Sequence, residues 1–153
     1  MANLVTPPGS KPDTAADELS VLHPERTLTI NGRDVTVDEY SFAMGLQLRA
    51  RHRPFFEALY QCLATGQEIG WEAVLDLIAA HKDSVDALVS AACGVPVAEI
   101  QTLDDVQGEL LFMTWWAVNG PFFVRAALRR LQTESETLAL AQKALAGAAS
   151  TPP

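Results

Sequence analysis

The three histidines are the first candidates for metal binding or proton transfer in this chain of 153 residues. They are His23, His52 and His81, and none lies three or four residues from another histidine or from a cysteine. Because a metal site needs ligands that converge with fixed geometry, this spacing disfavours a metal centre. His52 stands among arginines, and His81 is expected at a helix C-terminus, where a positive charge is favourable. We therefore expect neither a metal nor a cofactor.

Nucleophiles and paired carboxylates are the next candidates. The sequence has no glycine-rich phosphate loop, no Gly-x-Ser-x-Gly motif and no neighbouring cysteine and histidine. Asp104, Asp105 and Glu109 would suit acid–base catalysis, but acidic residues at such a position usually cap a helix. Cys62 and Cys93 lie in apolar stretches and are expected to be buried free thiols rather than a disulfide. These patterns predict a protein that is not an enzyme.

Two groups of arginines carry most of the clustered positive charge. They are Arg49, Arg51 and Arg53, and then Arg125, Arg129 and Arg130. Solvated helix ends are the favoured interpretation, and the alternatives are a nucleic-acid site or an electrostatic docking surface for an acidic partner. The net charge of −8 and the pI of about 4.7 disfavour non-specific binding to nucleic acid or to an anionic membrane. The acidic stretch 68–109 offers a partner for these arginines, within one chain or between copies.

Residues 110–123 should form the centre of the hydrophobic core. This stretch contains two of the three tryptophans and three of the six phenylalanines, and it carries no charge. It is too short for a spanning helix, which needs roughly 20 apolar residues. Asn119-Gly120-Pro121 predicts that two helices meet here at a tight corner, with Gly120 after one and Pro121 opening the next. Since neighbouring residues on a helix point about 100° apart, Trp115 and Trp116 cannot both face one core layer.

A change of periodicity over residues 27–37 predicts a β-hairpin. Apolar and polar residues alternate on both sides of Asn31-Gly32, a strong signal for a two-residue turn. The rest of the chain has helical periodicity. We therefore expect a mainly α fold, a compact domain of about five to seven helices with one N-terminal β-hairpin, over residues 25–146. Residues 1–24 are expected to be a disordered arm and residues 147–153 a flexible tail.

Capping and breaker signals set the expected helix boundaries. Thr36-Val-Asp-Glu39 matches a capping box that would open the first helix, and Pro54, Thr65-Gly66 and Cys93-Gly94 mark later junctions. Asp83 is expected to cap a fourth helix, and Asp104 or Asp105 a later one. The later helix is predicted to turn Val106, Leu110, Met113 and Trp116 inward. The apolar stripe of the last helix is predicted to continue through Leu138, Ala141 and Leu145.

The combination of hairpin, helix and aromatic stretch resembles a known family. The carrying segments are Thr27–Val37, Gly45-Leu-Gln-Leu-Arg49 and Met113-Thr-Trp-Trp-Ala-Val-Asn-Gly-Pro-Phe-Phe123. They resemble small tail assembly chaperones of long-tailed bacteriophages and prophages, which are encoded just before the tape measure protein. The resemblance implies a helical, non-enzymatic protein that binds and solubilises the tape measure protein. It also implies recruitment of tail tube subunits, action in the host cytoplasm and absence from the mature virion.

The aromatic stretch supplies the expected client-binding residues, on aromatic density alone. They are Phe112, Trp115, Trp116, Phe122 and Phe123. Competing functions are a small helical nucleic-acid-binding regulator and a structural tail or virion-completion protein. The lone hairpin and the long final helix also suggest a homo-oligomer. The N-terminus shows no signal peptide, and we expect no membrane association.

Overall fold

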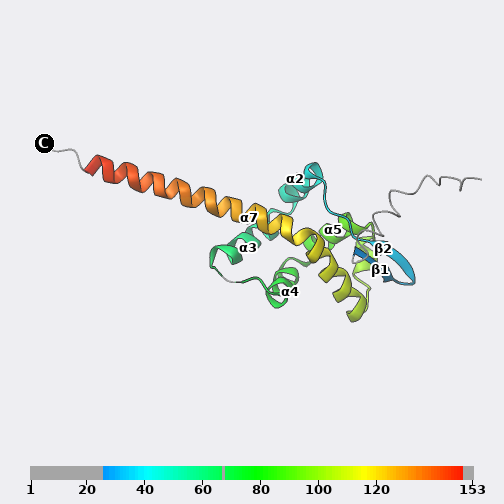
Figure 1. Ribbon diagram of the computed structural model, residues 1–153. Coiled ribbons are helices and arrows are strands. Elements are labelled where there is room, and N and C mark those ends of the chain that lie inside the picture. Colours follow the sequence, from blue (N-terminus) through cyan, green and yellow to red (C-terminus); the bar gives the residue numbers. More distant parts are fainter. Residues whose placement is uncertain (1–25, 67, 150–153) are drawn as a thin grey trace, which may run out of the picture.

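The computed structural model describes residues 26–66 and 68–149, and the predicted arm at 1–24 lies outside this range. Within it, the chain forms six helices and one two-stranded antiparallel hairpin, which confirms the mainly α fold (Figure 1). The final helix continues to Ala149, three residues beyond the predicted domain end at 146.

The hairpin consists of β1 (Thr27–Ile30) and β2 (Arg33–Thr36). Asn31 and Gly32 have φ values of 49° and 77°, the left-handed conformation that a type I′ turn requires. Leu28 lies opposite Val35, and both are buried together with Ile30 and Val37. The hairpin therefore packs one apolar face on the helices, which a lone two-stranded sheet needs for stability.

The first helix begins later than the capping box predicted. α2 spans Phe42–Arg51, and the Ser41 hydroxyl accepts a hydrogen bond from the Met44 amide, as an N-cap does. Thr36 instead ends β2. The segment between them stays extended because its backbone bonds elsewhere: the Asp38 amide donates to the Ala92 carbonyl at 2.9 Å.

Four further helices lead to the aromatic stretch. They are α3 (Arg53–Ala64), α4 (Trp71–Ala80), α5 (Lys82–Cys93) and α6 (Val97–Ile100). His52 separates α2 from α3, and Gly94 ends α5 with a φ of 73°, as predicted. Asp83 lies in the first turn of α5, and the N-cap position belongs to His81. His81 is also the C-cap of α4, which confirms its predicted place at a helix C-terminus.

The predicted corner at Asn119-Gly120-Pro121 is wrong, because α7 is one helix from Asp105 to Ala149. A proline inside a helix costs roughly 3 kcal/mol and kinks it, and Figure 1 shows α7 changing direction within its yellow section. Helical packing outweighs this cost. Trp115 and Phe123, two turns apart on either side of Pro121, are both buried and their rings lie 5.8 Å apart.

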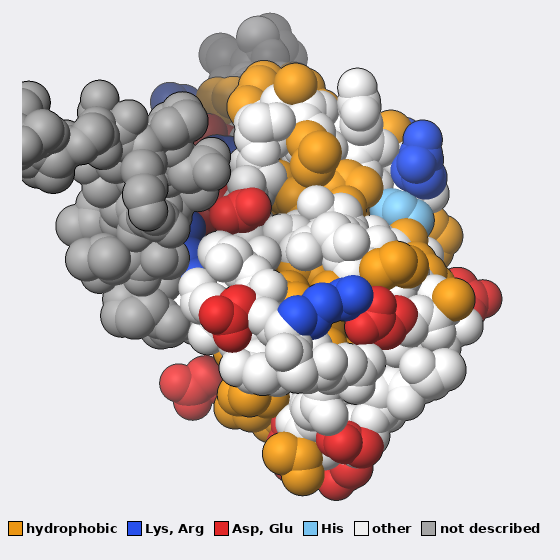
Figure 2. Space-filling model, turned by 90° about the vertical axis from the view of Figure 1, so that its right-hand side faces the viewer, with side chains coloured by type: hydrophobic (Ala, Val, Ile, Leu, Met, Phe, Trp, Pro, Cys, Tyr) orange, Lys and Arg blue, Asp and Glu red, His pale blue; other side chains and the backbone are white. Residues whose placement is uncertain are grey.

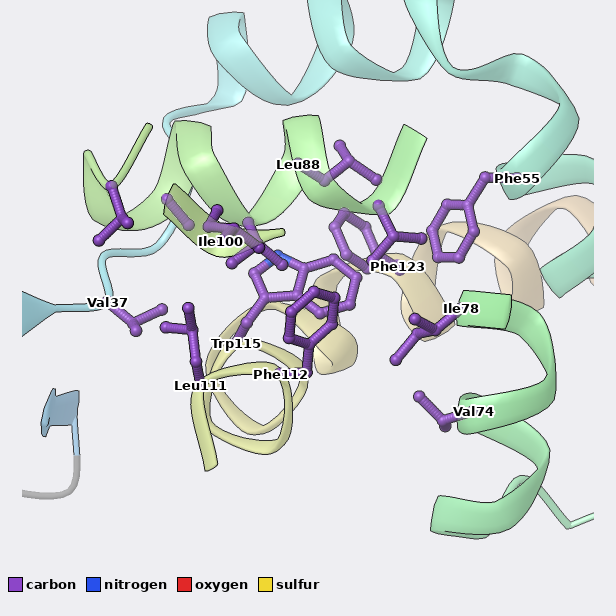
Figure 3. Close-up of a cluster of buried hydrophobic side chains, with 14 of the residues drawn as sticks. Val37, Phe55, Val74, Ile78, Leu88, Ile100, Leu111, Phe112, Trp115 and Phe123 are labelled. Carbon is purple, nitrogen blue, oxygen red and sulfur yellow. The ribbon is translucent and has the colours of Figure 1, made fainter. Parts of the chain in front are cut away.

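Trp115 lies at the centre of the core and is fully buried. Figure 3 shows its indole surrounded by side chains from several elements, among them Leu88, Ile100 and Phe112. The buried face of α7 carries Leu111, Phe112, Trp115 and Phe123. The predicted inward residues Val106, Leu110 and Met113 are instead 75%, 46% and 44% exposed. The predicted inward face of this helix is therefore shifted by about one residue from the buried face, because both faces of the segment are apolar.

Beyond Glu134, which bonds to Tyr60 of α3, the outer half of α7 projects away from the other described elements. Every residue from 132 to 149 is exposed, and Figure 1 shows this orange-to-red section extending away from the other elements. The predicted stripe of Leu138, Ala141 and Leu145 lies on this helix as expected, but no described element covers it: Leu138 and Leu145 are 63% and 72% exposed.

Candidate functional site

The five aromatic residues predicted to bind a client fall into two groups. Trp115, Phe112 and Phe123 are buried in the core, with 0%, 8% and 2% of their surfaces exposed. Trp116 and Phe122 are only partly buried. A surface that binds a partner can therefore use Trp116 and Phe122 directly, whereas the other three side chains support it from below.

A hydrogen-bonded network fixes the aromatic core to the segment that precedes α2. The buried Asn119 amide accepts from the Tyr40 backbone N–H and donates to the Asp38 carbonyl, both at 3.1 Å. The Trp115 indole N–H donates to the Tyr40 hydroxyl at 2.9 Å, and that hydroxyl donates to the Leu88 carbonyl. Burial raises the pKa of Tyr40 well above its usual value, so the phenol stays protonated. Asn119, predicted to sit in a turn, thus joins α7 to the segment that precedes α2.

A groove of about 530 Å³ opens between α2, α3 and α7. Its apolar lining includes Phe42, Leu46, Phe122 and Ala126. Phe42 and Leu46 are 73% and 51% exposed, although both are large and hydrophobic. Gly45 lets α2 approach α7 closely, since a Cβ atom at this position would lie 3.1 Å from Cζ of Phe122.

Positive charge borders this groove. Its lining includes Arg49, Arg53, Arg129 and Arg130, drawn from both predicted arginine clusters, with Glu57 as its acidic member. The structure therefore brings together two groups that lie more than seventy residues apart in the sequence. Arg51, on the same helix turn as Arg49, does not line the groove. Within the described residues, Arg49 and Arg129 form no salt bridge.

Arg130, unlike Arg49 and Arg129, is held by its own chain. Its guanidinium donates to Glu57 at 2.7 Å and to Glu134 at 3.0 Å, and it lies 3.7 Å from the centre of the Tyr60 ring. The Tyr60 hydroxyl donates to Glu134. The bond from Arg130 lowers the pKa of Glu57, while bonds from Tyr60 and Arg130 lower that of Glu134. This network attaches α3 to α7 at the point where α7 leaves the domain.

A second hollow of about 480 Å³ lies on the other side of Phe122. Leu110, Met113, Ala117 and Pro121 contribute its apolar lining along α7, and Arg26 and Arg125 contribute positive charge. Phe122 lines both hollows. Together they form one surface, which we call the Phe122 surface. It consists of the lining residues of the two hollows.

Sequence reasoning missed the contribution of α2 to the Phe122 surface. The signal was present: Phe42, Leu46 and Arg49 recur at positions i, i+4 and i+7, on a face different from that of the buried Gly45 and Leu48. Ala43 and Met44 on the same helix are also exposed, and Tyr40 precedes the helix.

The other residues considered for catalysis or metal binding are described by their hydrogen bonds and burial. Asp104 accepts a hydrogen bond from the Gln107 amide at 2.8 Å and so caps α7, as predicted. Glu109 accepts a hydrogen bond from the Trp71 indole at 3.3 Å. Cys62 and Cys93 are free and partly buried. Among residues 26–66 and 68–149, no group of three or more His, Cys, Asp or Glu side chains is placed to hold a metal ion.

The hairpin end of the molecule differs in charge from the arginine-bordered groove. Figure 2 shows this end with acidic side chains at several places on its surface and hydrophobic side chains in separate groups. Two ion pairs join the hairpin region to its surroundings, Arg33 with Glu99 at 2.6 Å and Arg26 with Glu39 at 2.8 Å. No helix in the described part of the chain combines the length and apolar character of a membrane span.

The fold and the Phe122 surface together define a mainly helical domain that presents an apolar, arginine-bordered surface beside a long projecting helix. Residues 18–153 match a family of unknown function, DUF6631, and the chain belongs to that family. No curated protein and no solved structure gives a significant match.

Proposed function

We propose that this protein is a non-enzymatic tail assembly chaperone of a long-tailed bacteriophage or prophage, and that its client is the tape measure protein. The single observation that carries the proposal is the Phe122 surface. It exposes Phe42 and Leu46 in one hollow and Leu110 and Met113 in the other, and Phe122 lines both. Surfaces of this kind, apolar and bordered by polar side chains, usually mark interaction sites. The sequence resemblance supplies the identity of the client.

The dimensions of the surface suit a helical client. An amphipathic helix docks by laying apolar residues at i, i+3, i+4 and i+7 into an apolar groove. The two hollows, of about 530 and 480 Å³, accept such side chains on either side of Phe122. A tape measure protein is very long and helical, so it offers many such segments. Covering them during assembly would keep the client soluble until tail tube subunits polymerise around it.

The arginines at the border favour a client helix whose apolar face is flanked by acidic residues. Arg49 and Arg129 make no salt bridge within the described residues and so remain available to a carboxylate. Arg53 also lines the groove. Electrostatic complementarity of this kind directs the orientation and speed of binding more than its affinity. The same arginines would serve a nucleic acid, but a phosphate backbone gains nothing from the apolar floor.

Co-expression with the tape measure protein tests the proposal. The wild-type chain should bring that protein into the soluble fraction and co-purify with it. Phe122→Ala should reduce the co-purified amount roughly tenfold or more, as expected for a central aromatic side chain in an interface. A client that stays insoluble, or one that co-purifies equally with Phe122→Ala, would contradict the proposal. Unfolding temperatures of both chains control for loss of folding.

Two further measurements separate the competing functions. A nucleic-acid-binding regulator would bind DNA with an affinity that falls steeply as salt rises, whereas the proposal predicts no such binding. A structural virion component would appear in the mass spectrum of purified particles. The proposal predicts a protein of the host cytoplasm that is absent from the mature particle.

A further inference from the structure

The outer half of α7 is unusual for a surface helix because it is apolar on nearly all sides. From Leu138 to Ala149, Gln142 and Lys143 are the only side chains that carry a polar group. Leu138 and Leu145, on one side of this segment, are 63% and 72% exposed. A helix that is apolar all round is normally covered by a partner. Alanine favours this helix intrinsically, but leucines at this exposure call for a partner that buries them.

The side of α7 that packs against α3 continues beyond the end of α3. Glu57 pairs with Arg130, and Tyr60 pairs with Glu134, so α3 and α7 run in the same direction and the contact advances one turn on each helix. α3 ends at Ala64, one turn after Tyr60. On α7, the same face continues through Leu138, Ala141 and Leu145, at spacings of three and four residues. Within residues 26–66 and 68–149, no other element covers this face beyond its contact with α3.

We infer that a second copy of this chain covers this face, through an antiparallel coiled coil of the two outer α7 segments. In such a pair, Leu145 of one helix packs against Ala141 of the other, and Ala141 packs against Leu145. Leu138 faces the last turn of the partner helix. Each layer then combines a large side chain with a small one, which is how facing core positions fill space. The inference is independent of the proposed function.

Two observations favour the antiparallel arrangement over the parallel one. A parallel pair would stack Leu138 and Leu145 on themselves and Ala141 on itself, so wide and narrow layers would alternate. It would also hold the two domains side by side, although each chain carries a net charge of −8. The antiparallel pair places the domains at opposite ends, where screening over distances beyond about 10 Å weakens their repulsion.

The position of α3 sets the register. Among the described residues, the last hydrogen bond from α3 to α7 is the one from Tyr60 to Glu134, so the partner helix must lie beyond this contact. Pairing Ala141 with Leu145 meets this condition and keeps Glu134 out of the contact between the two helices, which we call the seam. The seam is short, and it buries less than the roughly 800 Å² per partner of a stable interface. We therefore expect a weak dimer that forms at high micromolar concentration.

Sedimentation and light scattering over a concentration series measure this association. The wild-type mass should rise from 16.5 kDa towards twice that value as concentration increases. Leu145→Glu should weaken the association at least tenfold. Leu140→Glu is the matched control, because Leu140 is an equally exposed leucine on the opposite side of the helix, and it should leave the association unchanged. A monomer at every concentration, or equal effects of both variants, would overturn the inference.

Disulfide trapping tests the orientation. In a background with Cys62→Ser and Cys93→Ser, a mixture of Ala141→Cys and Leu145→Cys chains should cross-link to each other faster than either chain cross-links to itself. Faster cross-linking between identical chains would indicate a parallel pair and overturn the antiparallel register. Client binding through the Phe122 surface is measured separately with Leu145→Glu, which leaves that surface intact.

Discussion

At the scale of single residues, Asn119 shows how one buried amide positions the whole surface. It is 1% exposed, and its side chain satisfies the Tyr40 N–H and the Asp38 carbonyl. Asn119→Ala would leave both backbone groups without these partners, and each such loss costs about 1–3 kcal/mol. We expect a destabilisation of about 2–4 kcal/mol in urea unfolding. Thr133→Ala, an exposed change on the same helix, should cost under about 0.5 kcal/mol, and equal effects of the two variants would refute the assigned role.

His52, buried between α2 and α3, makes folding sensitive to pH. Burial, and then the positive charge of Arg51, lowers the pKa of His52 below its usual value. The unfolded chain therefore takes up this proton more readily than the folded chain. The contribution of neutral His52 to the free energy of unfolding is complete above about pH 6.5, the usual pKa of histidine. This contribution is lost as the pH falls below that value. Thermal unfolding at pH 7.5 and 5.5 should show this loss, and His52→Gln should reduce the difference between the two temperatures. An undiminished difference would contradict the assignment.

Gly120 in the middle of α7 gives a prediction at the scale of elements. A Cβ atom there would lie 2.9 Å from Cδ2 and Cε2 of Trp116, so the helix needs glycine at this position. Gly120→Ala should therefore destabilise the protein by about 1–3 kcal/mol, although alanine is the better helix former. Gly108→Ala is the control on the same helix. Its nearest atom would be Cβ of Leu103 at 3.9 Å, and it should stabilise by up to about 1 kcal/mol. Calorimetric unfolding that gave both variants the same sign would contradict this account.

The hairpin and most helix boundaries were predictable because their signals are local. Asn31-Gly32, Pro54 and Gly94 act through their own backbone conformations, which tertiary packing did not override. The corner at Gly120-Pro121 was not predictable in this way. Gly120 makes room for the Trp116 ring, and the buried face of α7 continues on both sides of Pro121. Tertiary packing therefore determines that the helix continues through this point.

The candidate surface was only partly predictable, for a related reason. Trp116 and Phe122 were identified from aromatic density, but α7 is apolar on two faces and the sequence does not say which face is covered. The groove also combines Arg49 and Arg53 with Arg129, residues distant in the chain that only the packing of α2 and α3 on α7 brings together. Its α2 contribution, Phe42 and Leu46, appeared in the sequence as an ordinary exposed helix face.

At the scale of the whole molecule, the distribution of charge predicts the salt dependence of client binding. The chain carries a net charge of −8, yet arginines border the first hollow. Arg49→Glu should weaken client binding roughly fivefold at low salt and less at high salt, since exposed charges are screened. Arg51→Glu makes the same change one half-turn away, outside the groove, and should have little effect. Equal weakening by both variants would indicate a general effect of charge instead of a docking site.

The most direct test of the central claim is amide hydrogen exchange of the protein with and without the tape measure protein bound. Binding is expected to slow exchange where the Phe122 surface lies: in α2 over residues 42–51, in α3 over residues 53–60 and in α7 over residues 110–130. Exchange in α5 and in the hairpin should change little. Protection confined to other elements, such as α4 and α5, would show that the client binds elsewhere and would contradict the assignment of the Phe122 surface.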